Sequence, residues 1–186
     1  MLKKIFLYLL FFSQVFFVSN NAYAKRSNLT VAGDITQILV PAAGLGVATY
    51  YEDREGQKEF IKSFVVNTGL LFALKYSMKD TKWGKRPNGG RESFPSGHSA
   101  AAFHGAFFMQ NRYGSKFGIP GMALASFTGY TRIEGDYHHL RDVLGGAALA
   151  FGVTYFMVDK YNNADTVKIS TEVDKKAALI DFKMAL

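Results

Sequence analysis

The sequence predicts an all-α protein: a helical bundle of about five helices in the mature chain, preceded by an N-terminal signal or anchor helix. The 186 residues suit a single domain. The apolar stretches are 14 to 17 residues long, which favours helices over strands, and only short polar connections separate them. We expect a helical domain at 25–158 between an N-terminal segment, 1–24, and a C-terminal tail, 159–186.

The first 24 residues have the pattern of a secretion signal. Lys3 and Lys4 precede a long apolar run. The segment Ala22–Ala24 then has the small-x-small pattern of a cleavage site. An uncleaved first membrane helix explains the same residues, and both interpretations keep the basic end inside. We therefore expect an exported protein, either in the inner membrane with its active site on the periplasmic face or in the periplasm.

Five apolar stretches follow, and each is rich in Ala, Leu, Phe and Gly. They are Ile35–Tyr51, Phe60–Tyr76, Ser96–Met109, Phe117–Tyr130 and Val143–Val158. Polar residues typical of helix starts precede or open three of them: Asp34, Ser96 and Asp142. These patterns predict the bundle helix by helix.

The relation of the bundle to a membrane stays open. Each stretch is shorter than the roughly 20 apolar residues that a membrane span needs. Lys62, Asn67 and Lys75 are also unfavourable in lipid. A membrane-spanning bundle and a soluble or peripheral one are both consistent with this pattern. Polar and apolar residues alternate in the tail from Thr166 to Val173, which fits a strand pair or a short amphipathic helix. We assign the tail no chemistry.

Composition narrows the range of functions. The absence of cysteine excludes disulfides, thiolate catalysis and Cys-ligated metal sites. The net charge of +7 suits nucleic acid, an anionic membrane surface or phosphorylated substrates. The basic residues gather at three polar clusters, and no nucleic-acid motif accompanies them, so we expect no nucleic-acid partner. The sequence predicts no particular oligomeric state.

Three polar clusters hold three of the four histidines. The clusters are Lys79–Pro87, Phe94–Ser99 and Thr131–Asp142. The helix start at Ser96–His98 offers free N–H groups and a partial positive charge, which together bind anions. Gly97 allows the backbone to approach a ligand closely. Lys79, Arg86 and Arg132 supply cations suited to phosphate oxygens. The clusters therefore predict a phosphate site.

Histidines from two different clusters suit one nucleophile and one proton donor. Asp142 follows His138 by four residues, so on a helix the two share a face and the carboxylate can fix the tautomer of the imidazole. A metal site formed by His138, His139 and Asp142 is the rival interpretation. Adjacent histidines on a helix point about 100° apart, which disfavours it. We expect no metal and no cofactor.

Taken together, the clusters resemble the three signature motifs of the type 2 phosphatidic acid phosphatase and vanadium haloperoxidase superfamily, over roughly residues 60–158. The motifs are Lys-x6-Arg-Pro, Pro-Ser-Gly-His and Ser-Arg-x5-His-x3-Asp. The matching residues are Lys79, Arg86 and Pro87; Pro95, Ser96, Gly97 and His98; and Arg132, His138 and Asp142. The one departure is Thr131, where the family has Ser, and it keeps the hydroxyl.

The resemblance implies a metal-independent phosphatase with a phosphohistidine intermediate. It implies that His138 attacks phosphorus, that Asp142 orients it and that His98 protonates the leaving oxygen. The implied ligands of the phosphoryl oxygens are Lys79, Arg86, Arg132, Ser96 and the Gly97 amide.

The implied substrate is a phosphomonoester or diphosphate, with a membrane lipid as the expected class. Two alternatives remain. One is a soluble periplasmic acid phosphatase that acts on small phosphomonoesters. The other is a membrane protein that binds phosphorylated lipid without hydrolysing it.

Overall fold

The computed structural model describes residues 27–161, and within them all regular structure is helical. The elements are α2 (Asn28–Tyr50), α3 (Arg54–Met78), the short 3-10 helix η2 (Lys82–Gly84), α4 (Gly97–Tyr113), α5 (Ser115–Glu134) and α6 (Leu140–Met157). The all-α prediction is confirmed, with five α-helices in the described part of the chain. The expected signal or anchor segment and the tail from residue 162 lie outside the described residues.

The helix starts differ from the prediction at two places. The helix α2 begins at Asn28 because Ser27 and Thr30 form a capping box, in which the Ser27 hydroxyl accepts from the Thr30 amide at 3.2 Å. Asp34 therefore lies nearly two turns inside the helix, and its prediction as a helix start is wrong. The prediction of Ser96 as the cap of α4 is confirmed, with its hydroxyl accepting from the Ser99 amide at 3.4 Å.

Asp142 is the second correction. The helix α6 begins at Leu140, with His139 in the cap position, so Asp142 is the third residue of the helix. Its carboxylate still serves the helix start, because Oδ2 accepts from the His139 amide at 2.8 Å. A carboxylate at this position satisfies an N–H group that the helix leaves free.

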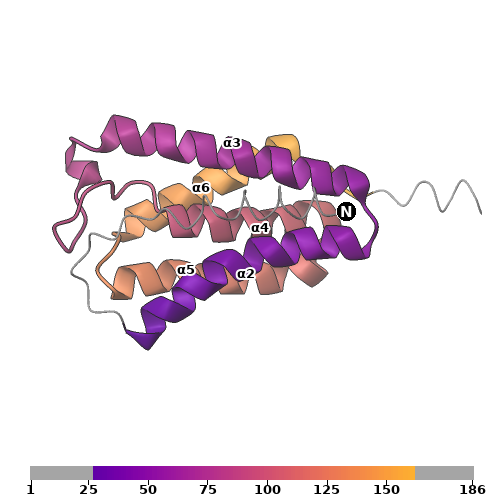
Figure 1. The fold of residues 1–186 in the computed structure, drawn as a ribbon, viewed down its shortest axis with the longest axis horizontal. Helices are drawn as coiled ribbons and strands as arrows, with labels where there is room; N and C mark the ends of the chain where they lie inside the picture. The colour runs from indigo at the N-terminus through magenta and orange to yellow at the C-terminus, as the bar shows by residue number, and fades with distance from the viewer. Residues whose placement is uncertain (1–26, 162–186) are drawn as a thin grey trace, which may run out of the picture.

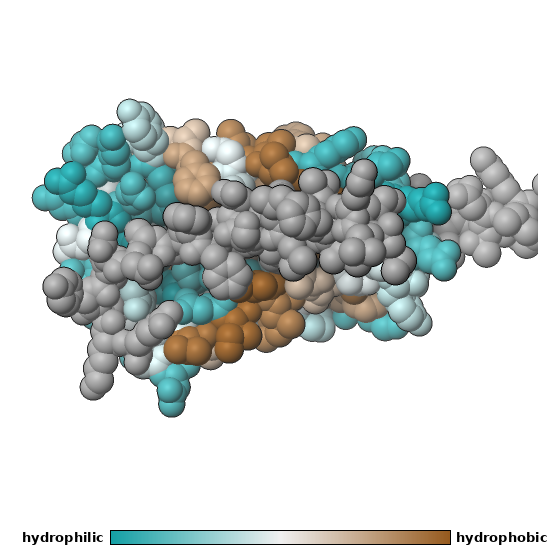
Figure 2. Space-filling model, viewed as in Figure 1, coloured by the Kyte–Doolittle hydropathy of each residue, from teal (hydrophilic) through white to brown (hydrophobic). Residues whose placement is uncertain are grey.

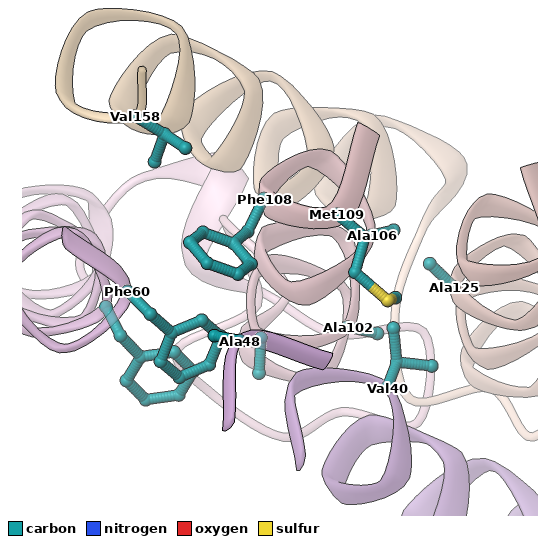
Figure 3. Close-up of a cluster of buried hydrophobic side chains, with 11 residues drawn as sticks. Val40, Ala48, Phe60, Ala102, Ala106, Phe108, Met109, Ala125 and Val158 are labelled. Atoms are coloured by element: carbon teal, nitrogen blue, oxygen red, sulfur yellow. The ribbon is translucent and has the colours of Figure 1, made fainter. Parts of the chain in front are cut away.

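The helices form an elongated bundle in which α4 packs against each of the other four (Figure 1). The close-up in Figure 3 shows Ala102 and Ala106 of α4 near Val40 of α2, and Phe60 of α3 belongs to the same cluster of buried side chains. These four residues are almost completely buried. Small side chains on the central helix let its neighbours approach, and the larger ones then fill the gaps to the density of a protein interior.

A buried ion-pair network ties the helices together at one end of the bundle. The guanidinium of Arg112 donates from Nε and NH2 to both carboxylate oxygens of Asp53. It also donates to Glu59 at 2.8 Å and to the carbonyl of Asp159 at 2.9 Å. This network joins the α2–α3 connection to the end of α4 and to the chain that leaves α6.

The outer face of the bundle carries an apolar band. On the face drawn in Figure 2, apolar residues lie over the middle of the bundle and the ends are mostly hydrophilic. The exposed residues of the helices include Ile35, Leu39, Val65, Phe72, Leu124, Leu144 and Phe151. Among the described helices, α2 alone is long and apolar enough to cross a bilayer, and 39% of its most apolar window is buried within the bundle.

Candidate active site

All three predicted polar clusters meet at one end of the bundle. This end is formed by the carboxyl ends of α3 and α5, the amino ends of α2, α4 and α6, and the two loops that join them (Figure 1). The Asn88 amide donates to the carbonyl of Asp136 at 3.2 Å, and the Ser96 amide donates to the carbonyl of Asp142 at 2.9 Å. The first bond joins the residue that follows the first cluster to the third cluster, and the other joins the second cluster to the third.

His98 and Arg132 meet on a carboxylate that the motifs do not include. Asp34 Oδ1 accepts from Arg132 NH1 at 2.7 Å and lies 2.9 Å from His98 Nε2. The close approach of α2 to α5 is possible because residue 33 is glycine: a Cβ there would lie 1.9 Å from Thr131 Oγ1 and 2.5 Å from Arg132 NH2. The fold thus uses α2 to fix two predicted site residues.

Three hydrogen bonds to neighbouring residues fix the guanidinium of Arg132. Besides Asp34, its guanidinium donates to the Thr30 carbonyl at 2.6 Å and to Thr131 Oγ1 at 3.0 Å. The side chain is 3% exposed. The Thr131 hydroxyl, at the one position where the motif departs from the family pattern, therefore has a direct role in orienting Arg132. A guanidinium carries five N–H groups, so the three bonds leave two of them for a ligand.

The spacing between Arg132 and His138 has a structural cause. The chain folds back after α5, so that the amides of Tyr137 and His138 both donate to the Arg132 carbonyl, at 3.0 and 3.1 Å. His138 is 4% exposed. Five residues between Arg132 and His138 are what this turn requires, and the turn places the imidazole beside the start of α6.

His138 and Asp142 form the second histidine–carboxylate pair. His138 Nδ1 lies 3.6 Å from Asp142 Oδ2, beyond hydrogen-bond range. The same oxygen accepts from Ser93 Oγ at 2.5 Å and from the His139 amide at 2.8 Å. Asp142 is therefore held rigidly, and a small rotation of the imidazole completes the pair. Catalytic hydrogen bonds often tighten in this way when substrate binds.

His138 is uncharged at neutral pH. Burial lowers its pKa to about 3, and the nearby charges of Arg86, Lys75 and His98 act in the same direction, against the opposing effect of Asp142. A neutral imidazole has a free nitrogen lone pair. With Nδ1 on the side of the carboxylate, Nε2 is the nitrogen available as a nucleophile or base.

In the first cluster, Arg86 lies at this site, whereas the ammonium of Lys79 is directed elsewhere. Arg86 is half-buried, and its buried Nε has no hydrogen-bond partner among the described residues. The ammonium of Lys79, at the carboxyl end of α3, lies 4.1 Å from the centre of the Tyr76 ring. Lys75, one turn earlier, instead donates to the Glu92 carbonyl at 2.6 Å.

The second cluster provides a helix start rather than a side-chain ligand. The Ser96 hydroxyl is fully buried and interacts with Ser99, whose own hydroxyl donates to it at 3.0 Å. Gly97 and His98 are the first two residues of α4, and the first N–H groups of a helix have no partner within it. These amides, with the positive end of the helix dipole, favour an anion at this place.

Three residues of the site were missed from the sequence. The sequence indicates Asp34 only as a helix start and Lys75 only as a residue unfavourable in lipid, and it gives Ser93 no role. For Lys75 a signal existed, since it is a charged residue within the apolar stretch Phe60–Tyr76. Ser93 lies in an irregular loop, and its role in holding Asp142 follows only from the hydrogen bond that the folded structure shows.

The second histidine of the third cluster lies outside this arrangement. The His139 ring contacts the carbonyl of Lys85 at 3.3 Å. Within residues 27–161, no three His, Asp or Glu side chains gather as a set that could hold a metal ion.

The comparisons with known proteins agree with the motifs. Residues 57–165, more than half of the chain, match the model of the PAP2 superfamily. The chain therefore belongs to the PAP2 superfamily, and it is a phosphatase. The match begins after α2, so Asp34 lies outside it.

Three curated relatives carry phosphatase names, the third being a probable diacylglycerol pyrophosphate phosphatase of Schizosaccharomyces pombe, 28% identical over 129 residues, which are 58% of this chain and 45% of that protein. The chain is 30% identical to the lipid A 4'-phosphatase of Helicobacter pylori over 138 residues, 69% of each protein. It is 42% identical to the lipid A 1-phosphatase of Porphyromonas gingivalis over 85 residues, which are 44% of this chain but 18% of that protein. Among solved structures, Aquifex aeolicus LpxE superposes with a TM-score of 0.58 at 23% identity, covering 72% of this chain and 87% of the other. That likeness supports the fold.

Proposed function

We propose that this chain is a metal-independent lipid phosphatase that works through a phosphohistidine at His138. The observation that carries the proposal is the state of this side chain. It is buried, uncharged and directed by Nδ1 toward a carboxylate, and cations and a helix amino end lie around it. A nucleophile in such surroundings is suited to attack an anionic phosphoryl group.

The reaction proceeds in two displacements. His138 Nε2 attacks phosphorus, the bond from phosphorus to the ester oxygen breaks, and His98 gives a proton to that oxygen. Water then attacks the phosphohistidine and gives a proton back to His98, which releases inorganic phosphate and restores His138. Asp142 stabilises the imidazolium character that develops as the N–P bond forms.

The phosphoryl oxygens are bound by Arg86, Arg132 and the free backbone amides of Gly97 and His98 at the start of α4. These donors gain most as charge spreads over the oxygens in the transition state. Lys79, which the motif assigns to the same task, has to leave the Tyr76 ring to reach them.

The proposed substrate is a lipid phosphate. Two of the relatives are named as lipid A phosphatases, and the apolar band between hydrophilic ends supports a place in or on a membrane (Figure 2). With an N-terminal export signal at 1–24, the catalytic domain at 25–158 then lies in the inner membrane with its active site on the periplasmic side. A soluble periplasmic enzyme for small phosphomonoesters is the outcome to be tested against this.

The experiment is hydrolysis of p-nitrophenyl phosphate and of a short-chain phosphatidic acid by EDTA-treated protein. Wild type is compared with His138→Ala and with His139→Ala, a matched removal of the neighbouring histidine. We expect activity that survives EDTA, is lost in His138→Ala and is kept in His139→Ala. An acid-labile, alkali-stable phosphoenzyme is expected in a quenched reaction.

Two results contradict the proposal. Activity that disappears with EDTA and returns with a divalent ion excludes the metal-independent route. Equal activity in wild type and His138→Ala excludes His138 as the nucleophile. A preference for p-nitrophenyl phosphate over the lipid, by kcat/KM, replaces the lipid substrate with a soluble one and leaves the chemistry unchanged.

A further inference from the structure

Lys75 brings a further cation to the catalytic end of the bundle, beside Arg86 and Arg132. It lies in the last turn of α3, and its half-buried side chain donates to the Glu92 carbonyl at 2.6 Å. Its charge acts on Arg86 and Asp142, and it is one of the charges that act on His138. The ammonium of Lys75 is therefore part of the electrostatic surroundings of the nucleophile.

Lys79 follows one helical turn later, yet its ammonium lies elsewhere. Position 79 is the cap of α3, where the chain leaves the helix, and the side chain lies over the exposed ring of Tyr76 at 4.1 Å. Lys75 is still inside the helix, and its side chain is directed to the loop that carries Arg86 and Ser93. The backbone of Lys79 is still helical, so the two lysines differ in the direction of their side chains and not in their place on the helix.

Lys75 and Arg86 both have N–H groups left over that can donate to an anion. Lys75 and Arg86 are like charges that repel each other, and their neighbours Glu92 and Asp142 carry the opposing charges. The buried Arg86 Nε has no partner among the described residues. An ammonium has three N–H groups, and the bond to Glu92 uses one of them. Both cations can therefore donate to one shared anionic ligand.

We propose that Lys75 is a substrate-binding residue, which donates to the phosphoryl oxygens together with Arg86. The inference deepens the proposed function and rests on it. Lys75 acts as a point charge beside the forked guanidinium, and the dianionic phosphoryl group removes the repulsion between the two cations. The bond to the Glu92 carbonyl holds the ammonium in place before substrate arrives.

The test combines binding and turnover. Trp83 is the only tryptophan of the chain, lies in η2 and contacts Phe94 with ring centres 5.1 Å apart, so its fluorescence reports on the loop beside the site. Orthovanadate and inorganic phosphate are titrated against wild type, Lys75→Met, Lys75→Gln and Lys75→Arg. Lys62→Met, an exposed lysine of the same helix, is the matched control. The same proteins are assayed for kcat/KM, with thermal unfolding as the check on folding.

We expect Lys75→Met to lose roughly 100-fold in kcat/KM, the scale for removing one donor to a transition-state oxygen. Vanadate affinity falls with it, and Lys62→Met matches wild type in both. Arginine at position 75 restores part of both losses because it keeps the charge. Glutamine does not, although it can still donate to the Glu92 carbonyl.

Two outcomes overturn the inference. If Lys75→Gln keeps as much vanadate affinity and kcat/KM as Lys75→Arg, then Lys75 only anchors the loop through the Glu92 carbonyl. If Lys75→Met keeps the vanadate affinity and kcat/KM of the wild type and Lys79→Met loses both, then Lys79 is the residue that contacts the phosphate. Both leave the proposed function intact, since that depends on His138→Ala. A wild type that binds vanadate through Lys75 but hydrolyses no substrate contradicts the proposed function alone.

Discussion

Asp34 and His98 are joined at 2.9 Å between carboxylate Oδ1 and imidazole Nε2, although 64 residues separate them in the chain. The same oxygen accepts from Arg132 at 2.7 Å. One carboxylate on α2 thus orients both the proposed acid and a proposed phosphate ligand. The arrangement resembles the His138–Asp142 pair, so each proposed catalytic histidine has its own carboxylate.

Asp34 is expected to act through His98 on the leaving group. Asp34→Asn keeps the size of the side chain but removes the charge that favours the protonated imidazole. We expect kcat to fall roughly 100-fold for an alkyl phosphate, the lower range for loss of general acid catalysis. With p-nitrophenyl phosphate, whose leaving group needs no proton, the loss should be much smaller. Equal losses on both substrates contradict this role and point to Arg132 instead.

Asp142 is expected to orient the nucleophile without being needed for the fold. Asp142→Asn keeps an oxygen for Ser93 and the His139 amide but presents no charge to the developing imidazolium. We expect a loss of roughly 10³- to 10⁴-fold in kcat, the scale known for a triad carboxylate. Ser93→Ala, which removes one of the bonds that hold the carboxylate, should cost far less. Unfolding curves for both variants establish that the protein is folded, and a loss below about 10-fold in Asp142→Asn contradicts the pairing.

The burial of His138 predicts an acid-labile fold. Its pKa is lowered to about 3 in the folded chain, against about 6.5 in the unfolded chain. Below about pH 6.5 the unfolded chain therefore takes up a proton that the folded chain refuses. The stabilising contribution is complete above that pH and is lost as the pH falls toward 3. His138→Gln should lose less stability between pH 7.5 and 5 than wild type does in thermal unfolding, and identical pH dependence contradicts this.

The ion-pair network at the opposite end of the bundle should affect stability and not chemistry. Asp53→Ala leaves the guanidinium of Arg112, 6% exposed, without its two-point partner. Breaking a buried pair in this way costs about 3–5 kcal/mol of unfolding free energy. Glu55→Ala, which removes an exposed carboxylate paired with Lys58 in the first turn of α3, is the control and should cost far less. kcat per folded molecule should be unchanged in both, and a lower kcat in Asp53→Ala contradicts the separation.

Much of the site could be predicted from the sequence because its parts are local. Ser96 caps the helix that begins with Gly97 and His98, and such caps depend on neighbouring residues. His138 comes just before the cap of α6 and Asp142 lies in the first turn of that helix, so their short separation in the chain keeps them close together. Apolar stretches of helical length were enough for the all-α class, since each must bury its apolar face against another helix.

The tertiary structure alone decided which distant charges reach these local parts. Nothing in the sequence near Asp34 distinguishes it from a helix cap; a capping box at Ser27 makes that role unnecessary, and the packing of α2 on α5 at Gly33 brings its carboxylate to His98. Lys75 and Lys79 are equivalent in chemistry, and only the folded structure shows that Lys75 donates to the Glu92 carbonyl while Lys79 lies over the Tyr76 ring. Hydrogen bonds and ion pairs act over a few ångströms in space. A sequence therefore predicts them within a turn or a helix end, and only the packing of whole helices decides the rest.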